Sequence, residues 1–94
     1  MPRAVSVRIS VPLERAALPA LFERTCALLE ANEASILRCE VAGVGADAVA
    51  IDALARLALV ARRRGCGVRL CGASEELLAL VAFMGLADVL HEGS

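Results

Sequence analysis

The chain has 94 residues, which is enough for one small domain with a single hydrophobic core. Its formal net charge is −1, so its overall electrostatics favours neither a nucleic-acid partner nor a membrane partner. All ten Lys and Arg positions are occupied by Arg, and Phe22 and Phe83 are the only aromatic residues. Two aromatic side chains argue against a base-stacking surface for single-stranded nucleic acid.

The cysteines and the single histidine do not form a metal-binding pattern. Cys26, Cys39, Cys66 and Cys71 include no Cys-x-x-Cys pair, and His91 lies near the end of the sequence. Structural zinc sites use closely spaced ligands, usually in two pairs. We therefore expect no metal and no cofactor, and we expect the cysteines to be small buried side chains in a reducing compartment.

No apolar run approaches the ~18 residues that a membrane-spanning helix needs. The first ten residues contain no apolar segment of the kind found in a secretion signal. These patterns predict a cytoplasmic protein with no direct membrane insertion.

Residues 5–11 (VSVRISV) alternate between apolar and polar side chains. This period of two predicts a strand with one buried face, ended by Pro12. Apolar residues at helical spacing then predict a helix over residues 18–32, with Pro19 in its first turn. The residues expected on the buried face of the strand are Val5, Val7, Ile9 and Val11, and those expected on the buried face of the helix are Leu18, Leu21, Phe22, Thr25, Leu28 and Leu29.

Residues 35–41 (SILRCEV) predict a second strand, because polar and apolar side chains alternate again. A helix is predicted over residues 47–64, and Gly65 is expected to end it. Asp47 is expected to be its N-cap, where a carboxylate accepts hydrogen bonds from free N–H groups of the first turn. The residues expected on the buried face of the second strand are Leu37, Cys39 and Val41.

Residues 67–72 (GVRLCG) predict a third strand, and Ser74 is expected to cap a helix that runs to Met84. Gly85 is expected to end that helix, and residues 86–90 to pack back as a short final element. The sequence therefore predicts a strand followed by a helix three times, with a short tail.

Strands that alternate with helices of this length predict parallel strands joined by right-handed crossovers. A parallel sheet covered on both faces has continuous apolar strands, whereas Arg8, Arg38 and Arg69 place an arginine on the polar face of each strand. We therefore predict a single α/β domain over residues 1–94, with a small, mostly parallel sheet and helices packed on one face. Three arginines on one face can bind an anion, but a solvated face with Glu40 as a neighbour explains them more simply.

The outward face of the helix predicted over residues 47–64 combines charged and apolar side chains. The charged side chains are Asp52, Arg56 and Arg63, and the apolar ones at their flanks are Val49, Leu59 and Val60. Asp52 and Arg56 have the favourable i, i+4 order for an ion pair. Such a mixture is typical of a small protein interface, and it is equally typical of an Ala-rich helix that is buried more deeply. The sequence leaves both interpretations open.

No combination of side chains predicts catalysis, so we do not expect an enzyme. His91 is expected in a fraying tail, and Asp47 and Asp52 lie ~140° apart around the helix axis, so the two carboxylates do not converge. The sequence contains neither the phosphate-binding loop pattern nor the dinucleotide-binding glycine pattern. A nucleotide sensor that uses the turn at Gly43 and Gly45 is an alternative, which a thermal-shift titration with nucleotide would test.

The segment ARRRGCGVRLC, followed by GASEELLALVAFMGLADVL, resembles the STAS domains, which are named after sulphate transporters and anti-sigma-factor antagonists. The resemblance covers residues 34–90. It implies a small sheet with helices on one side and a protein-binding regulator of transcription, whose partner is a kinase-like anti-sigma factor. The alternative within the family is an accessory subunit that binds the ATPase of a lipid-type transporter. The family usually opens with two strands before its first helix, whereas this sequence has one.

STAS domains that respond to phosphorylation carry the motif D-S-[ST]-G at the start of the helix that precedes Gly65. Asp47 aligns with the motif Asp, Ala48 with the phosphorylated Ser, Val49 with the next Ser or Thr, and Ala50 with the Gly. Because Ala48 has no hydroxyl group, the resemblance implies a binding site that phosphorylation at this position cannot switch. Pairing with a second copy of the chain stays open. The residues expected to bind the partner are Asp47, Ala48, Val49, Asp52, Arg56, Leu59 and Val60.

Overall fold

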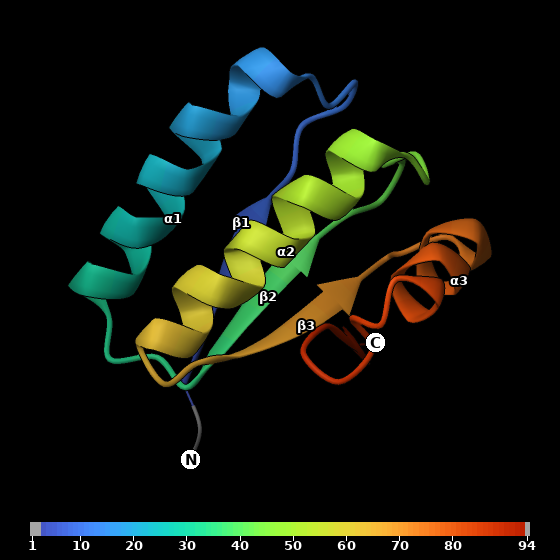
Figure 1. The fold of residues 1–94 in the computed structure, drawn as a ribbon. Coiled ribbons are helices and arrows are strands. Elements are labelled where there is room, and N and C mark those ends of the chain that lie inside the picture. The colour runs from blue at the N-terminus through green and yellow to red at the C-terminus, as the bar shows by residue number, and fades with distance from the viewer. Residues whose placement is uncertain (1–2, 94) are drawn as a thin grey trace.

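The computed structural model describes residues 3–93, and within that range it shows a four-stranded parallel sheet and three α-helices (Figure 1). The strands, in the order in which they lie side by side, are β1 (Ala4–Arg8), β2 (Ile36–Glu40), β3 (Gly67–Cys71) and β4 (His91–Gly93). The helices are α1 (Leu18–Ala31), α2 (Ala48–Arg63) and α3 (Glu75–Phe83), and one turn of 3-10 helix, η1 (Arg15–Ala17), precedes α1.

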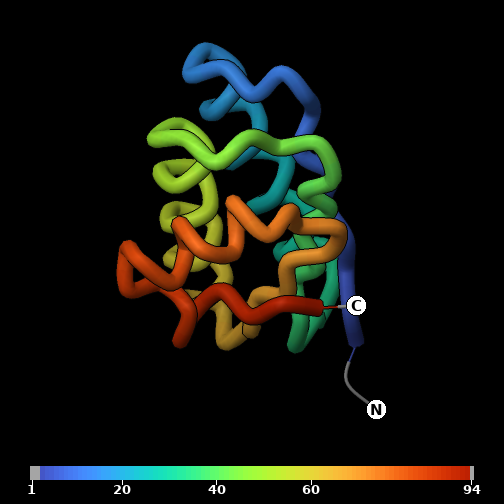
Figure 2. Tube along the Cα trace, turned by 90° about the vertical axis from the view of Figure 1, so that its right-hand side faces the viewer, coloured from blue at the N-terminus to red at the C-terminus, as the bar shows by residue number. Residues whose placement is uncertain are grey.

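The helices cover one face of the sheet and leave the other face bare (Figure 2). Right-handed crossovers between parallel strands in sequential order place every connecting helix on the same face. On the covered face Leu37 and Leu70 are fully buried, whereas Arg8 on the opposite face is exposed. The predicted α/β architecture, a small parallel sheet with helices on one face, is therefore confirmed.

Helix α2 packs across the middle of the sheet, with α1 and α3 on either side of it (Figure 1). Its apolar residues recur at helical spacing, so one continuous stripe faces the strands. Four of the buried residues in this stripe are alanines, whose small side chains allow the helix to lie close to the sheet. The buried residues of α2 are Ala50, Ile51, Ala53, Leu54, Leu57, Ala58 and Ala61.

Both predicted helix caps are present. The Asp47 carboxylate accepts a hydrogen bond from the Ala50 N–H at 2.9 Å, and the Ser74 hydroxyl accepts one from the Leu77 N–H at 3.1 Å. Each bond supplies a partner to an N–H group that the first turn of a helix leaves free. Gly65 has a φ of 72° and follows the end of α2, as predicted.

The first strand is shorter than predicted. β1 ends at Arg8. The Ile9 N–H still donates to the carbonyl oxygen of Glu40, the last residue of β2, at 3.1 Å. Because β2 ends there, the residues after Ile9 have no strand beside them with which to pair. Val11, predicted on the buried face, is therefore 52% exposed. Phe22 and Leu28, predicted to be buried, are only half-buried because they lie at the two edges of the apolar stripe of α1.

The sequence did not predict β4. This strand pairs in parallel with β3 and places His91 beside Arg69, while the element expected over residues 86–90 is a series of turns. The residues of β4, His-Glu-Gly, have no apolar alternation, so the strand depends on its pairing with β3 rather than on local preference. His91 therefore lies at the edge of the sheet and not in a fraying tail.

Candidate functional site

The N-terminal end of α2 carries the residues that the sequence aligned with a phosphorylation motif. Asp47 is exposed, and its carboxylate is used as the N-cap described above. Ala48 is the first residue of the helix and is also exposed. The position that would hold an acceptor hydroxyl thus faces solvent at a helix N-terminus, but a methyl group occupies it.

Asp52, on the outward face of α2, is the centre of a cluster of three charged side chains. Asp52 accepts a hydrogen bond from Arg56 at 3.0 Å, so the predicted i, i+4 pair is present. It also accepts one from Arg15 of η1 at 3.1 Å, which the sequence did not predict. Arg56 in turn lies over the Phe22 ring of α1, 5.8 Å from its centre. These contacts tie α2 to η1 and α1, although exposed ion pairs contribute at most ~1 kcal/mol each.

The apolar side chains predicted beside these charges fall into two groups. Val49 and Val60 are half-buried and pack against the core, so the burial interpretation holds for them. Leu59 is 50% exposed, so it remains available for contact with a partner. Among the predicted partner-binding residues, Ala48, Asp52 and Leu59 therefore share one side of α2, while Val49 and Val60 lie on a side that is partly covered.

An apolar groove of about 450 Å³ lies between α2 and α3. Among the described residues that line it, Asp52 is the only charged one, and it lies on the same wall as Ala48. Ala48, Asp52, Ala55 and Leu59 follow one another at helical spacing, so they share one side of α2. The residues that line the groove are Ala48, Ile51, Asp52, Ala55, Leu80 and Met84.

Helix α3 supplies the apolar surface that the sequence interpretation missed. Phe83 is 85% exposed and the following Met84 is 52% exposed, while Leu80 lines the groove. Only Leu77 and Val81 of this helix are buried. The signal was present in the sequence, because residues 77–84 (LLALVAFM) are apolar without interruption and one helix face cannot bury them all.

Cys39 is fully buried in the core. Burial, with a contribution from nearby Cys71, raises the pKa of the Cys39 thiol from 9.0 to about 12 and keeps it protonated at neutral pH. Among residues 3–93, no three His, Cys, Asp or Glu side chains gather where they could hold a metal ion. No helix in the same range is both long and apolar enough to cross a membrane.

No protein-family model matches this sequence, and no curated protein is significantly similar to it. The resemblance to STAS domains therefore rests on the quoted sequence segments alone.

Proposed function

We propose that this chain is a protein-binding regulatory module resembling the anti-sigma-factor antagonists, and that it acts in the cytoplasm by docking a protein partner in the groove between α2 and α3. The observation that carries the proposal is the apolar lining of this groove, which includes the exposed Met84, together with the exposed Phe83 next to Met84 in sequence. Phe83 and Met84 are two of the four large hydrophobic residues that are exposed among residues 3–93. Exposed apolar surface of this kind is typical of a site of protein contact.

The shape and composition of the groove favour a helical segment as the bound element. Two helices form its walls, and its lining is apolar except at Asp52. An amphipathic helix binds such a groove through apolar side chains spaced three and four residues apart. Asp52 is already paired with Arg15 and Arg56, so it does not present an unpaired charge to a segment bound in the groove.

Ala48 links the groove to the aligned phosphorylation motif. It lines the groove at the start of α2, where an added phosphate would place about two negative charges beside the bound partner. Because alanine has no hydroxyl group, this position cannot be phosphorylated. The proposed module therefore binds its partner constitutively, unless control is exerted on the partner itself.

Affinity capture with three versions of the tagged chain tests the proposal. Met84→Asp places a charge in the groove, and Val11→Asp places one at a residue with the same 52% exposure outside it. The wild type and Val11→Asp are expected to retain the same partner, and Met84→Asp to lose it. A partner retained equally by all three versions would contradict docking in the groove.

The identity of the captured protein, determined by mass spectrometry, then separates the two proposed roles. A kinase-like anti-sigma factor would support the regulator of transcription. The ATPase of a lipid-type transporter would instead make the chain an accessory subunit that uses the same groove.

A further inference from the structure

The bare face of the sheet is a second surface that the described part of the chain leaves without a packing partner. All three α-helices of residues 3–93 lie on the other face (Figure 2). The four strands are all parallel to one another. A sheet of this kind usually carries packed elements on both of its faces. The bare face is therefore a place where an element of another molecule can complete the usual arrangement.

The charged side chains on this face are mainly cationic. Arg8, Arg38 and Arg69 come from β1, β2 and β3, and Glu40 is the only acidic residue of these three strands. Within residues 3–93, neither Arg8 nor Arg69 takes part in an ion pair. The whole chain has a formal net charge of −1, so the positive charge is a local property of this face.

Two of these arginines are neighbours across adjacent strands. Arg38 of β2 and Arg69 of β3 are partners in the register of the sheet. Like charges at directly opposed positions destabilise a sheet. Contact with solvent does not require such a pair, because uncharged polar residues or opposite charges would keep the face equally polar. The pair is instead suited to an anionic partner, which would neutralise both charges.

The spacing of the arginines indicates the shape of that partner. Neighbouring strands lie ~4.8 Å apart, so the Cα atoms of Arg38 and Arg69 are separated by ~5 Å. Arg8 lies two strands from Arg69 and two residues further along, which gives ~12 Å between their Cα atoms. Side chains at positions i and i+4 of a helix are ~6 Å apart, and those at i and i+8 are ~12 Å apart. Carboxylates along one side of a helix therefore match the arginines better than a single anion does.

We propose that the bare face of the sheet docks an acidic helix of a protein partner, with carboxylates at positions i, i+4 and i+8. The carboxylates pair with Arg8, Arg38 and Arg69, whose planar guanidinium groups match a carboxylate. Glu40, which lies beside Arg8 in the sheet, repels the bound helix. This surface and the groove between α2 and α3 lie on opposite sides of the sheet, so the two can be occupied at the same time.

A titration of the ¹⁵N-labelled protein at low ionic strength, followed by amide chemical shifts, tests this proposal. The probe is a synthetic alanine-rich helical peptide with glutamates at positions i, i+4 and i+8. Saturable shifts are expected in residues 4–8, 36–40 and 67–71. A peptide of the same composition, with its glutamates on different sides of the helix, is expected to bind about threefold more weakly or worse, because it loses at least one exposed ion pair. No saturable shift with the first peptide, or equal affinities for the two peptides, would overturn the proposal.

Two variants with opposite expected effects identify the side chains that contact the peptide. Arg69→Gln is expected to weaken binding of the first peptide about threefold or more, because it removes one ion pair. Glu40→Gln is expected to strengthen binding about twofold, because it removes a repulsive charge. The amide spectrum of each free variant shows whether its fold is intact.

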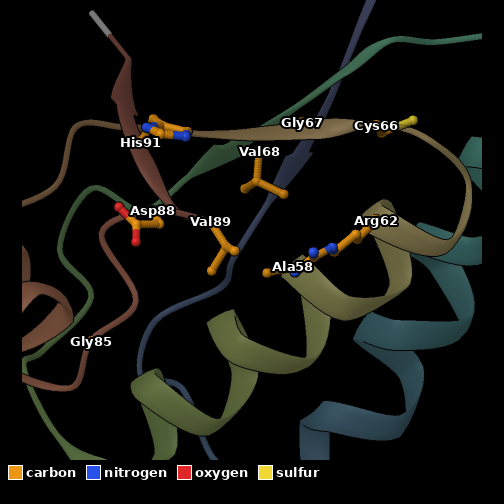
Figure 3. Close-up of a pocket in the computed structure, with 9 residues that line it drawn as sticks. All are labelled: Ala58, Arg62, Cys66, Gly67, Val68, Gly85, Asp88, Val89 and His91. Atoms are coloured by element: carbon orange, nitrogen blue, oxygen red, sulfur yellow. The ribbon is translucent and has the colours of Figure 1, made fainter.

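The matched control is Arg62→Gln, which removes an exposed arginine on the helix side of the sheet. Arg62 and His91 line a pocket of about 560 Å³ between the end of α2 and the segment after α3 (Figure 3). Because Arg62 extends from α2 and not from the bare face, this variant is expected to leave the affinity for the peptide unchanged. Equal losses of affinity in Arg62→Gln and Arg69→Gln would show that only the net charge matters, and would contradict docking on the bare face.

Discussion

Asp47 and Ala48 are neighbours with separate roles at the start of α2. Asp47 stabilises the helix, since its carboxylate accepts the Ala50 N–H at 2.9 Å. Ala48 contributes a methyl group to the wall of the groove. The first role is local, so residue type and position were enough to predict it. The second depends on where α3 lies, and no local pattern around Ala48 contains that information.

The N-cap leads to a prediction for stability. Asp47→Ala removes the hydrogen-bond acceptor of the first turn, so the free energy of unfolding is expected to fall by ~1 kcal/mol. Urea denaturation measures this change. Asp88→Ala is the control, because the Asp88 side chain is exposed and makes no ion pair within the described residues, and it is expected to change stability little. Equal effects of the two substitutions would contradict the capping role.

Cys39 leads to a prediction for the pH dependence of stability. Its pKa is about 12 in the folded protein, above the ordinary value of 9.0, so the unfolded chain releases this proton first as the pH rises. The stabilisation by the protonated, buried thiol is therefore complete below pH 9 and is lost as the pH rises from 9 toward 12. The Cys39→Ala variant is expected to lose less stability over this range than the wild type, as measured by urea denaturation at several pH values. Parallel losses in the two proteins would show that this thiol is not the cause.

In α2 and α3, the sequence predicted the helices but not which of their flanking apolar residues are covered by neighbouring elements. The period of α2 predicted its buried stripe, yet two of its flanking residues, Val49 and Val60, pack into the molecule while Leu59 does not. Flanking positions of a helix are covered or exposed by its neighbouring elements, and the sequence of α2 alone does not contain those neighbours. Helix α3 has more apolar residues than one face can bury, so its sequence predicts that some of them are exposed. The sequence of α3 does not show that these residues lie beside α2.

Strand β4 shows a further limit of prediction from the sequence. Its three residues have low strand preference, and they pair with β3 because the turns over residues 86–90 return the chain to that edge. The pairing brings His91 to a pocket wall, where the sequence had placed it in a tail. Short edge strands of this kind are fixed by long-range contacts, which no local pattern records.

The groove leads to a prediction in which stability and binding change differently. Ala48→Glu adds an acidic side chain to the first turn of α2, where the helix dipole favours it, so the free energy of unfolding is expected to stay the same or rise slightly. The same charge lies at the groove, so affinity for the captured partner is expected to fall about tenfold or more. Urea denaturation and titration calorimetry measure the two quantities.

The matched control for this prediction is Ala27→Glu, which adds the same charge at an exposed alanine of α1 away from the groove. It is expected to leave the affinity unchanged. If Ala48→Glu also leaves the affinity unchanged, the start of α2 does not contact the partner.

At the scale of the whole molecule, the two faces of the sheet differ in chemistry. The bare face carries Arg38 and Arg69 side by side, with Ser6 next to Arg38 and His91 next to Arg69 in the same cross-strand row. These polar side chains allow this face of the sheet to contact solvent, as the alternation of polar and apolar residues in the strands predicted. The exposed apolar residues of α3 lie on the helix side, so we expect the partner to dock there.

Site-specific photo-crosslinking in the complex with the captured partner tests whether the partner docks on the helix side of the sheet. Phe83 is 85% exposed, so the larger p-benzoylphenylalanine can replace it without disturbing the core, and the same probe at Arg8 samples the bare sheet face. A crosslink to the partner is expected from position 83 and none from position 8. A crosslink from position 8 and none from position 83 would contradict docking between α2 and α3.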